Sequence, residues 1–114
     1  MADCLFCRIV SQQIPATVVE ETDHTLAFRD INPRAPVHVL VIPKEHIASL
    51  MEFTPEHGAI LSEIHQTIQK VARKEKIDGT GFRLVVNTGK DSGQAVSHVH
   101  YHVLGGRGLN WPPG

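Results

Sequence analysis

The sequence predicts one α+β domain that contains a five-stranded, mainly antiparallel sheet, a short N-terminal helix and one long helix. Five short β-rich runs are separated by turn residues, and a single long stretch has apolar residues at helical spacing. The chain has 114 residues, which is enough for one hydrophobic core of ordinary size but not for two. We therefore expect a single domain over residues 1–114.

The first half of the chain predicts a short helix, a β-hairpin and a buried strand. The expected elements are, in order, a helix from about residue 5 that stops before Pro15, strands at 18–22 and 25–30 joined by a turn at 23–24, and a strand at 37–42. Pro33 and Pro36 exclude a central strand between them, so residues 30–36 are expected to form a rigid loop. The run at 37–42 is apolar at nearly every position, which is typical of a strand covered on both faces.

The second half predicts the long helix and the last two strands. Thr54-Pro55-Glu56 is a helix start, with threonine as the N-cap, proline at the first helical position and an acid in the first turn. Apolar residues then recur at helical spacing, and we expect Asp78-Gly79 to stop the helix. Strands at 82–87 and 98–104 follow, separated by a polar loop at 88–97.

Composition and charge exclude several classes of protein. Eleven basic and 12 acidic residues give a formal net charge of −1, so the chain has no broad basic surface for a nucleic acid polymer. No run reaches the roughly 18 to 20 apolar residues of a membrane span, and the first residues lack the pattern of a secretory signal. We expect no membrane partner and a cytoplasmic location.

The most unusual feature is a run of alternating histidines, His98, His100 and His102, among eight histidines in total. In a strand these side chains share one face, with successive imidazoles roughly 6.6 Å apart. Three interpretations stand: ordinary strand histidines, a catalytic metal site, or a neutral imidazole nucleophile. The glycine-containing loop Gly89–Gln94 directly precedes the run and is expected to form a phosphate cradle from its backbone N–H groups, which favours the nucleophile.

Motifs along nearly the whole chain are similar to those of the histidine triad nucleotide-binding hydrolases. They are Phe28-Arg29-Asp30-Ile31-Asn32-Pro33, Val41-Ile42-Pro43-Lys44 with His46, Val85-Val86-Asn87, Gly93-Gln94, His98-Val99-His100-Tyr101-His102-Val103 and the ending Trp111-Pro112-Pro113-Gly114. The chain most resembles the nucleoside phosphoramidase branch of that family. The resemblance implies the histidine triad fold, a homodimer with an intersubunit contact from the C-terminal tail, and a purine nucleotide such as AMP or GMP as ligand.

The resemblance also implies catalytic roles. His100 would attack the α-phosphorus and carry a transient nucleotidyl group, while His102 would hydrogen-bond the phosphate and Asn87 would direct its amide to the phosphate or leaving group. The implied reaction is hydrolysis of purine nucleoside phosphoramidates. The alternatives are a dinucleoside polyphosphate hydrolase, a nucleotide-binding regulatory protein with weak activity, and a metal-dependent hydrolase that uses the triad as ligands.

The nucleotide-binding residues implied by the resemblance are Asp30 for the ribose, Ile31 for the base, and Gly93, Gln94 and Ala95 with the two catalytic histidines for the phosphate. The chain departs from the branch at Ala95, where a serine hydroxyl is common. We expect the missing hydrogen bond to slow turnover by roughly 1.5 to 3 kcal/mol.

A C-x-x-C motif, Cys4-Leu5-Phe6-Cys7, stands at the start of the chain. The resemblance implies a structural zinc, not needed for the chemistry, that is held by Cys4, Cys7, His46 and His98. Two buried helix cysteines or a redox pair are the competing interpretations, although no βαβ unit surrounds the motif. His38 is expected to be a hydrogen-bonded core histidine and not a ligand.

Overall fold

The computed structural model describes residues 3–114 and confirms the predicted α+β architecture. The elements are α1 (Leu5–Val10), β1 (Val18–Glu21), β2 (Thr25–Arg29), β3 (Val37–Pro43), the 3₁₀ turns η1 (Leu50–Glu52) and η2 (Pro55–His57), α2 (Gly58–Lys74), β4 (Phe82–Val86), η3 (Lys90–Ser92) and β5 (Tyr101–Gly105). The strand order is β1-β2-β3-β5-β4, and each neighbouring pair is antiparallel. None of the helices formed by the described residues is long and apolar enough to cross a membrane.

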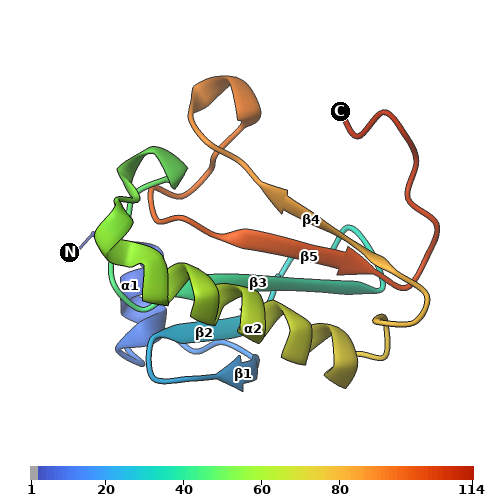
Figure 1. Ribbon diagram of the computed structural model, residues 1–114, viewed down its shortest axis with the longest axis horizontal. Helices are drawn as coiled ribbons and strands as arrows, with labels where there is room; N and C mark the ends of the chain where they lie inside the picture. Colours follow the sequence, from blue (N-terminus) through green and yellow to red (C-terminus); the bar gives the residue numbers. More distant parts are fainter. Residues whose placement is uncertain (1–2) are drawn as a thin grey trace.

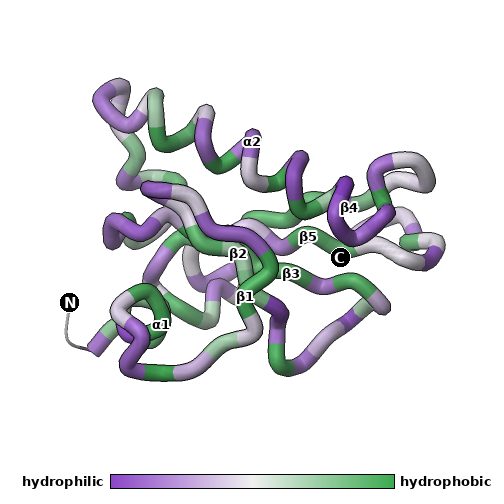
Figure 2. The backbone as a smooth tube through the Cα atoms, turned by 90° about the horizontal axis from the view of Figure 1, so that it is seen from below, coloured by the Kyte–Doolittle hydropathy of each residue, from purple (hydrophilic) through white to green (hydrophobic). Residues whose placement is uncertain are grey.

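The two helices lie on opposite faces of the sheet (Figures 1 and 2). Alternate residues of β3 divide between them: Val39 and Val41 pack with α2, whereas Leu40 and Ile42 pack with Phe6 of α1. All of these side chains are buried, which confirms that this strand is covered on both faces. The larger core, on the α2 side, contains no histidine, and the α1 side carries the candidate site residues.

The last strand begins three residues later than expected, at Tyr101 and not at His98. The preceding segment leaves the sheet because the Val99 N–H donates to the carbonyl oxygen of Ile47, at 2.7 Å, and not to a neighbouring strand. The long helix also starts later, since residues 55–57 form the separate turn η2, and it ends at Lys74.

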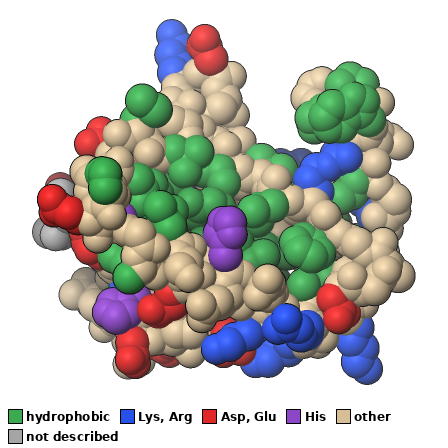
Figure 3. Space-filling model, in the orientation of Figure 1, with side chains coloured by type: hydrophobic (Ala, Val, Ile, Leu, Met, Phe, Trp, Pro, Cys, Tyr) green, Lys and Arg blue, Asp and Glu red, His purple; other side chains and the backbone are tan. Residues whose placement is uncertain are grey.

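Among residues 3–114 the two edges of the sheet differ, because α2 packs against the edge strand β1 but not extensively against the other edge strand, β4. The edge strand β4 pairs only with β5, and α2 packs against β1, β2 and β3. Phe82 and Leu84 of β4 are therefore 39% and 40% exposed. Figure 3 shows hydrophobic side chains gathered on this side of the molecule.

Candidate active site and metal centre

A cavity of about 820 Å³ lies on the α1 side of the sheet. Its walls come from α1, from the loop after β2 and from the triad segment. The predicted site residues that line it are Asp30, Ile31, Ala95, His100 and His102. Asn87, Gly93 and Gln94 are not among its lining residues, so the structure brings together only part of the predicted nucleotide site.

The three triad histidines lie on the α1 face of the sheet but divide between two sites. The His100 and His102 rings lie 5.0 Å apart, centroid to centroid, and both line the cavity. His98 is fully buried and its Nδ1 faces the two cysteines. This division separates a candidate catalytic pair from a candidate metal ligand.

The tautomer of His100 follows from its hydrogen bond. Nδ1 lies 2.8 Å from the carbonyl oxygen of His98, which only accepts, so Nδ1 carries the proton. The neutral ring then has an unprotonated Nε2 with a free lone pair. An imidazole nitrogen in this state is a nucleophile.

His38 belongs to the site, although its sequence context in an apolar strand indicated only a core residue. The Arg34 backbone N–H donates to His38 Nδ1 at 3.0 Å, so the His38 proton is on Nε2. That Nε2 lies 2.9 Å from His102 Nδ1 and donates to it. His102 therefore carries its own proton on Nε2, which is buried without a hydrogen-bond partner among residues 3–114.

Burial keeps both of these imidazoles neutral. Burial, with the nearby His100 and His38 rings, lowers the pKa of His102 to about 4, against a smaller opposing effect of Asp30. Burial also lowers the pKa of His38. At neutral pH the His102 Nε2–H, which has no partner among residues 3–114, is thus a neutral hydrogen-bond donor beside the unprotonated Nε2 of His100.

The cluster of Asp30, His38 and His102 has ligand atoms within 4.8 Å of one another, a spacing that a metal ion also requires. The tautomers argue against a metal here. A metal on His38 Nε2 would move the proton to Nδ1, where it would face the Arg34 N–H donor. Within this cluster His38 and His102 are joined by a hydrogen bond, and Asp30 Oδ2 lies 3.4 Å from His38 Nε2. This arrangement disfavours the use of the triad as catalytic metal ligands.

Part of the predicted phosphate cradle in residues 89–94 is used by hydrogen bonds within the loop. The Gly93 and Gln94 N–H groups donate to the carbonyl oxygens of Lys90 and Gly89. The Gln94 side-chain amide also donates to Ala48 and Val96 carbonyl oxygens and accepts from the Gly89 N–H, so Gln94 shapes the loop.

The N–H groups of Ala95 and Val96 remain as anion donors. Neither makes a hydrogen bond within the described chain, and both residues line the cavity beside His100. Asn87 directly follows β4, and its side-chain amide has no hydrogen-bond partner among residues 3–114. Backbone N–H groups that are free to bind an anion therefore extend beyond the predicted cradle, to Ala95 and Val96.

The four predicted metal ligands converge at the start of α1. Cys4 Sγ lies 3.3 Å from His98 Nδ1, Cys7 Sγ lies 3.4 Å from His46 Nδ1 and 3.6 Å from His98 Nδ1, and all four ligand atoms lie within 4.8 Å of one another. A tetrahedral zinc ion places sulfur and nitrogen ligands about 3.5 Å apart, given its usual bond lengths. The geometry therefore fits such an ion.

The chemistry of the donor set also fits a cation. The His98 Nε2–H donates to the Pro43 carbonyl oxygen at 2.9 Å, which leaves Nδ1 unprotonated and free to coordinate. Burial and the neighbouring Cys4 raise the pKa of Cys7 to about 11, so a thiolate at this position requires a compensating positive charge. Two cysteines and two imidazoles form the soft donor set that zinc prefers.

The fold and the paired imidazoles are those of the histidine triad class, and the comparisons with known proteins agree. A model of the HIT domain matches residues 11–109. A 14 kDa zinc-binding protein of Brassica juncea is 46% identical over 114 residues, covering 98% of this chain and 100% of that protein. Adenylylsulfatase HINT1 of Arabidopsis thaliana is 46% identical over 112 residues, covering 96% of this chain and 76% of that protein.

Solved structures agree as well. The crystal structure of a HIT family hydrolase from Legionella pneumophila Philadelphia 1 has a TM-score of 0.96 and 47% identity, covering 98% of this chain and 100% of that one. The chain belongs to the HIT domain family.

Proposed function

We propose that this protein hydrolyses purine nucleoside phosphoramidates through a nucleotidyl intermediate on His100, releasing a nucleoside monophosphate such as AMP or GMP. One observation carries the proposal. The unprotonated Nε2 of His100 and the unpartnered Nε2–H of His102 belong to neighbouring rings that line one cavity. A nucleophile and a donor are thus paired where a phosphoryl group can lie.

In the first step His100 Nε2 attacks the α-phosphorus and the bond from phosphorus to the leaving amine breaks. The leaving nitrogen takes a proton from solvent, and the His102 Nε2–H donates a hydrogen bond to the phosphoryl oxygens. Water then attacks phosphorus, the bond to His100 breaks, and the nucleoside monophosphate leaves. The neutral donor is most effective in a buried setting, where electrostatic stabilisation is strong.

The nucleoside would lie between α1 and the loop after β2. We assign the ribose hydroxyls to Asp30, whose Oδ1 accepts from the Asn32 N–H and whose carboxylate has remaining lone pairs. We assign the base to the apolar part of the cavity, with Phe6 inside and Ile31, 92% exposed, at its border. An exposed isoleucine beside an apolar cavity is suited to cover a flat ring.

The phosphate would be bound by the free N–H groups of Ala95 and Val96, with Gly93 and Gln94 holding the loop in shape. We assign the amide of Asn87 to the phosphate or leaving group, which its lack of an internal partner permits. The side chain of Ala95 has no hydroxyl, so this residue can donate to the phosphate only through its backbone N–H.

We propose a structural zinc on Cys4, Cys7, His46 and His98. The donor geometry and the name of the Brassica juncea relative support this assignment. When bound, the ion would crosslink α1 to the segment after β3 and to the triad segment. The residues proposed for chemistry need no metal.

We also propose a homodimer that forms through β4. This edge strand has no outer partner, and its apolar side chains lie beside α2 without a cover. Trp111 in the C-terminal tail is 80% exposed. An apolar face of this kind on a small chain favours association with a second copy.

The proposed function is tested by trapping the intermediate and by comparing substrates. Purified protein is assayed with a fluorogenic adenosine phosphoramidate, a dinucleoside polyphosphate and adenylyl sulfate, the last because one relative is named an adenylylsulfatase. We expect the fastest turnover with the phosphoramidate and, in acid-quenched mass spectra, an adenylyl group on the peptide that contains His100.

His100→Ala is expected to lose both turnover and the adduct. The matched control is His65→Ala on α2, a histidine that is exposed and remote from the cavity. Full turnover by His100→Ala would exclude covalent catalysis by this residue. Faster hydrolysis of the dinucleoside polyphosphate than of the phosphoramidate would identify the protein as a dinucleoside polyphosphate hydrolase.

A further inference from the structure

The metal ligands and the nucleotide cavity share α1, a helix of only six residues. Cys4 and Cys7 point towards His46 and His98, while Leu5, Phe6 and Ile9 line the cavity. A helix this short is not stable by itself in water. Its position must therefore be set by its attachments to the rest of the fold.

The attachments of α1 are few. Its backbone hydrogen bonds, in the described part of the chain, all stay within residues 4–14. The long-range polar contacts of its two cysteines are those to His46 and His98. Beyond these, the main tie is the packing of Phe6 into the smaller core.

Phe6 lies between the metal ligands and the catalytic ring. Its ring meets His98 edge-on at 5.9 Å and His100 edge-on at 5.1 Å, with interplanar angles of 75° and 85°. The second contact that fixes His100 is its hydrogen bond to the carbonyl oxygen of His98. Besides the neighbouring His102 ring, these two contacts of the proposed nucleophile thus come from residues adjacent to, or part of, the metal centre.

The segment that presents the phosphate donors has the same anchor. The carbonyl oxygens of Ile47 and Ala48, directly after the ligand His46, accept from the Val99 N–H and the Gln94 amide. Two of the segments that meet at the metal ligands, α1 and the triad segment, therefore also line the cavity, and the segment after His46 holds the loop that carries the anion donors.

We propose that metal binding at Cys4, Cys7, His46 and His98 and nucleotide binding in the cavity are thermodynamically coupled, and that Phe6 is the positioning residue that transmits this coupling to His100. The inference rests on the proposed function, since it takes AMP as the ligand of the cavity. Coupling between two sites is reciprocal. Zinc should tighten AMP binding, and AMP should tighten zinc binding by the same factor.

The coupling is measured on the full chain without an activity assay. AMP affinity is determined by calorimetry for the zinc-loaded and the chelator-treated protein, and zinc affinity by competition with a chromophoric chelator, with and without AMP. Cys4 and His46 line a second cavity of about 590 Å³, through which a chelator can reach the ion. We expect a change of about tenfold or more in each affinity, and equal factors in the two arms.

Phe6→Leu tests the transmitting residue. This variant keeps all four ligands and an apolar cavity wall but removes the ring that meets His98 and His100. We expect this variant to bind one zinc ion per chain. The factor by which zinc changes its AMP affinity should fall below about threefold, which is weak coupling. Val10→Ala, which truncates an apolar residue of α1 that packs in the same core but does not line the cavity, is the matched control and should keep the full factor.

The possible results separate the two proposals. Zinc-loaded protein that does not bind AMP overturns the proposed function, and the coupling with it. Protein that binds both ligands with unchanged affinities overturns the coupling alone. Loss of the far-ultraviolet circular dichroism of the whole domain on zinc removal also overturns it, because the effect would then be global unfolding and not the placement of α1. Full coupling in Phe6→Leu rejects Phe6 as the transmitting residue.

Discussion

At the scale of single residues, one backbone N–H sets the protonation of two imidazoles, the buried His38 and the half-buried His102. The Arg34 N–H donates to His38, His38 donates to His102, and the proton that remains on His102 Nε2 has no partner within the described residues. An unpartnered buried donor carries a desolvation cost of about 1 to 3 kcal/mol. A bound phosphate oxygen would accept a hydrogen bond from His102 Nε2 and so relieve that cost. The tautomers of His38 and His102 in the unliganded protein therefore favour binding of the substrate's phosphate.

His38→Leu tests whether His38 fixes the tautomer of His102. Leucine removes the donor to His102 Nδ1, so the His102 proton is no longer held on Nε2. We expect kcat to fall about ten- to a hundredfold, corresponding to roughly 1 to 3 kcal/mol, with a smaller change in AMP affinity. Rapid-quench kinetics with a phosphoramidate substrate measure the loss. His38→Gln retains an N–H donor and should recover part of it; full kcat in the leucine variant would show that the tautomer is set elsewhere.

Ala95→Ser tests the departure from the phosphoramidase branch. The added hydroxyl lies beside the free N–H groups of Ala95 and Val96, where a phosphate would bind. A hydrogen bond to a charged group stabilises by about 1.5 to 3 kcal/mol, so turnover should rise by about tenfold or more. Ala95→Val adds volume without a donor and is the control. Unchanged or lower turnover in the serine variant would show that the backbone donors already saturate the phosphate.

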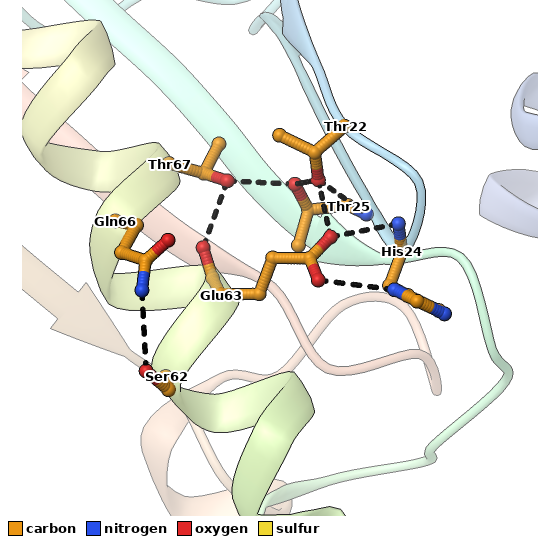
Figure 4. A network of polar contacts seen from close by, with 7 residues as sticks. All are labelled: Thr22, His24, Thr25, Ser62, Glu63, Gln66 and Thr67. Carbon is orange, nitrogen blue, oxygen red and sulfur yellow. Dashed lines mark hydrogen bonds and ion pairs between the residues drawn. The ribbon is translucent and has the colours of Figure 1, made fainter.

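At the scale of elements, a carboxylate fastens the β1–β2 hairpin to α2 (Figure 4). Glu63 on α2 accepts hydrogen bonds from the Thr22 hydroxyl and the His24 N–H, and its other oxygen meets the His24 ring. These hydrogen bonds, chiefly that from Thr22, lower the pKa of Glu63 to about 2. Nearby, Thr25 and Thr67 are fully buried and their hydroxyls lie 2.7 Å apart.

Glu63→Gln should destabilise the protein in a pH-dependent way. A carboxylate whose pKa is lower in the folded than in the unfolded state stabilises the fold above the unfolded pKa of 4.5, and this contribution is lost as the pH falls from 4.5 to about 2. We therefore expect a lower Tm for the variant at pH 7 and a difference that vanishes near pH 2. Glu56→Gln, on an exposed residue, is the control at pH 7. A constant difference across this pH range would contradict the prediction.

The elements show what the sequence could and could not predict. Periodicity and proline positions predicted the helices, strands and sheet of the whole chain, because those signals are local. The sequence could not indicate that the N–H groups of Gly89, Gly93 and Gln94 donate within their own loop, because loop hydrogen bonds have no sequence period. The link from His38 to His102 was missed because it joins two strands whose pairing register the sequence does not specify. The four metal ligands that the family resemblance implied converge; the spacing of the C-x-x-C motif alone would have placed only the two cysteines together.

At the scale of the molecule, the sheet separates two tasks. The helices α1 and α2 lie on opposite faces (Figure 2). The α2 face holds the larger core, and the α1 face holds the cavity and the metal ligands. The part of the α2 face at β4 remains partly exposed: Phe82 and Leu84 lie open there, although Leu84 pairs in register with the core residue Val103. A sheet face that is apolar but uncovered in one chain is suited to a second copy.

Leu84→Asp tests this surface in the whole molecule. Leu84 pairs in register with the core residue Val103, and a charge at that position would be buried in a dimer but solvated in a monomer. We expect the unsubstituted protein to have the mass of a dimer in light scattering, and the variant to have the mass of one chain.

Met51→Asp places the same charge on a residue that is 80% exposed outside β4, so it should remain dimeric. Retained dimers in Leu84→Asp, or monomers in the unsubstituted protein, would reject association through this face. Since the exposed area is apolar and the chain carries a net charge of only −1, higher salt should not dissociate the dimer. Dissociation by salt would instead indicate an interface held by charge pairs.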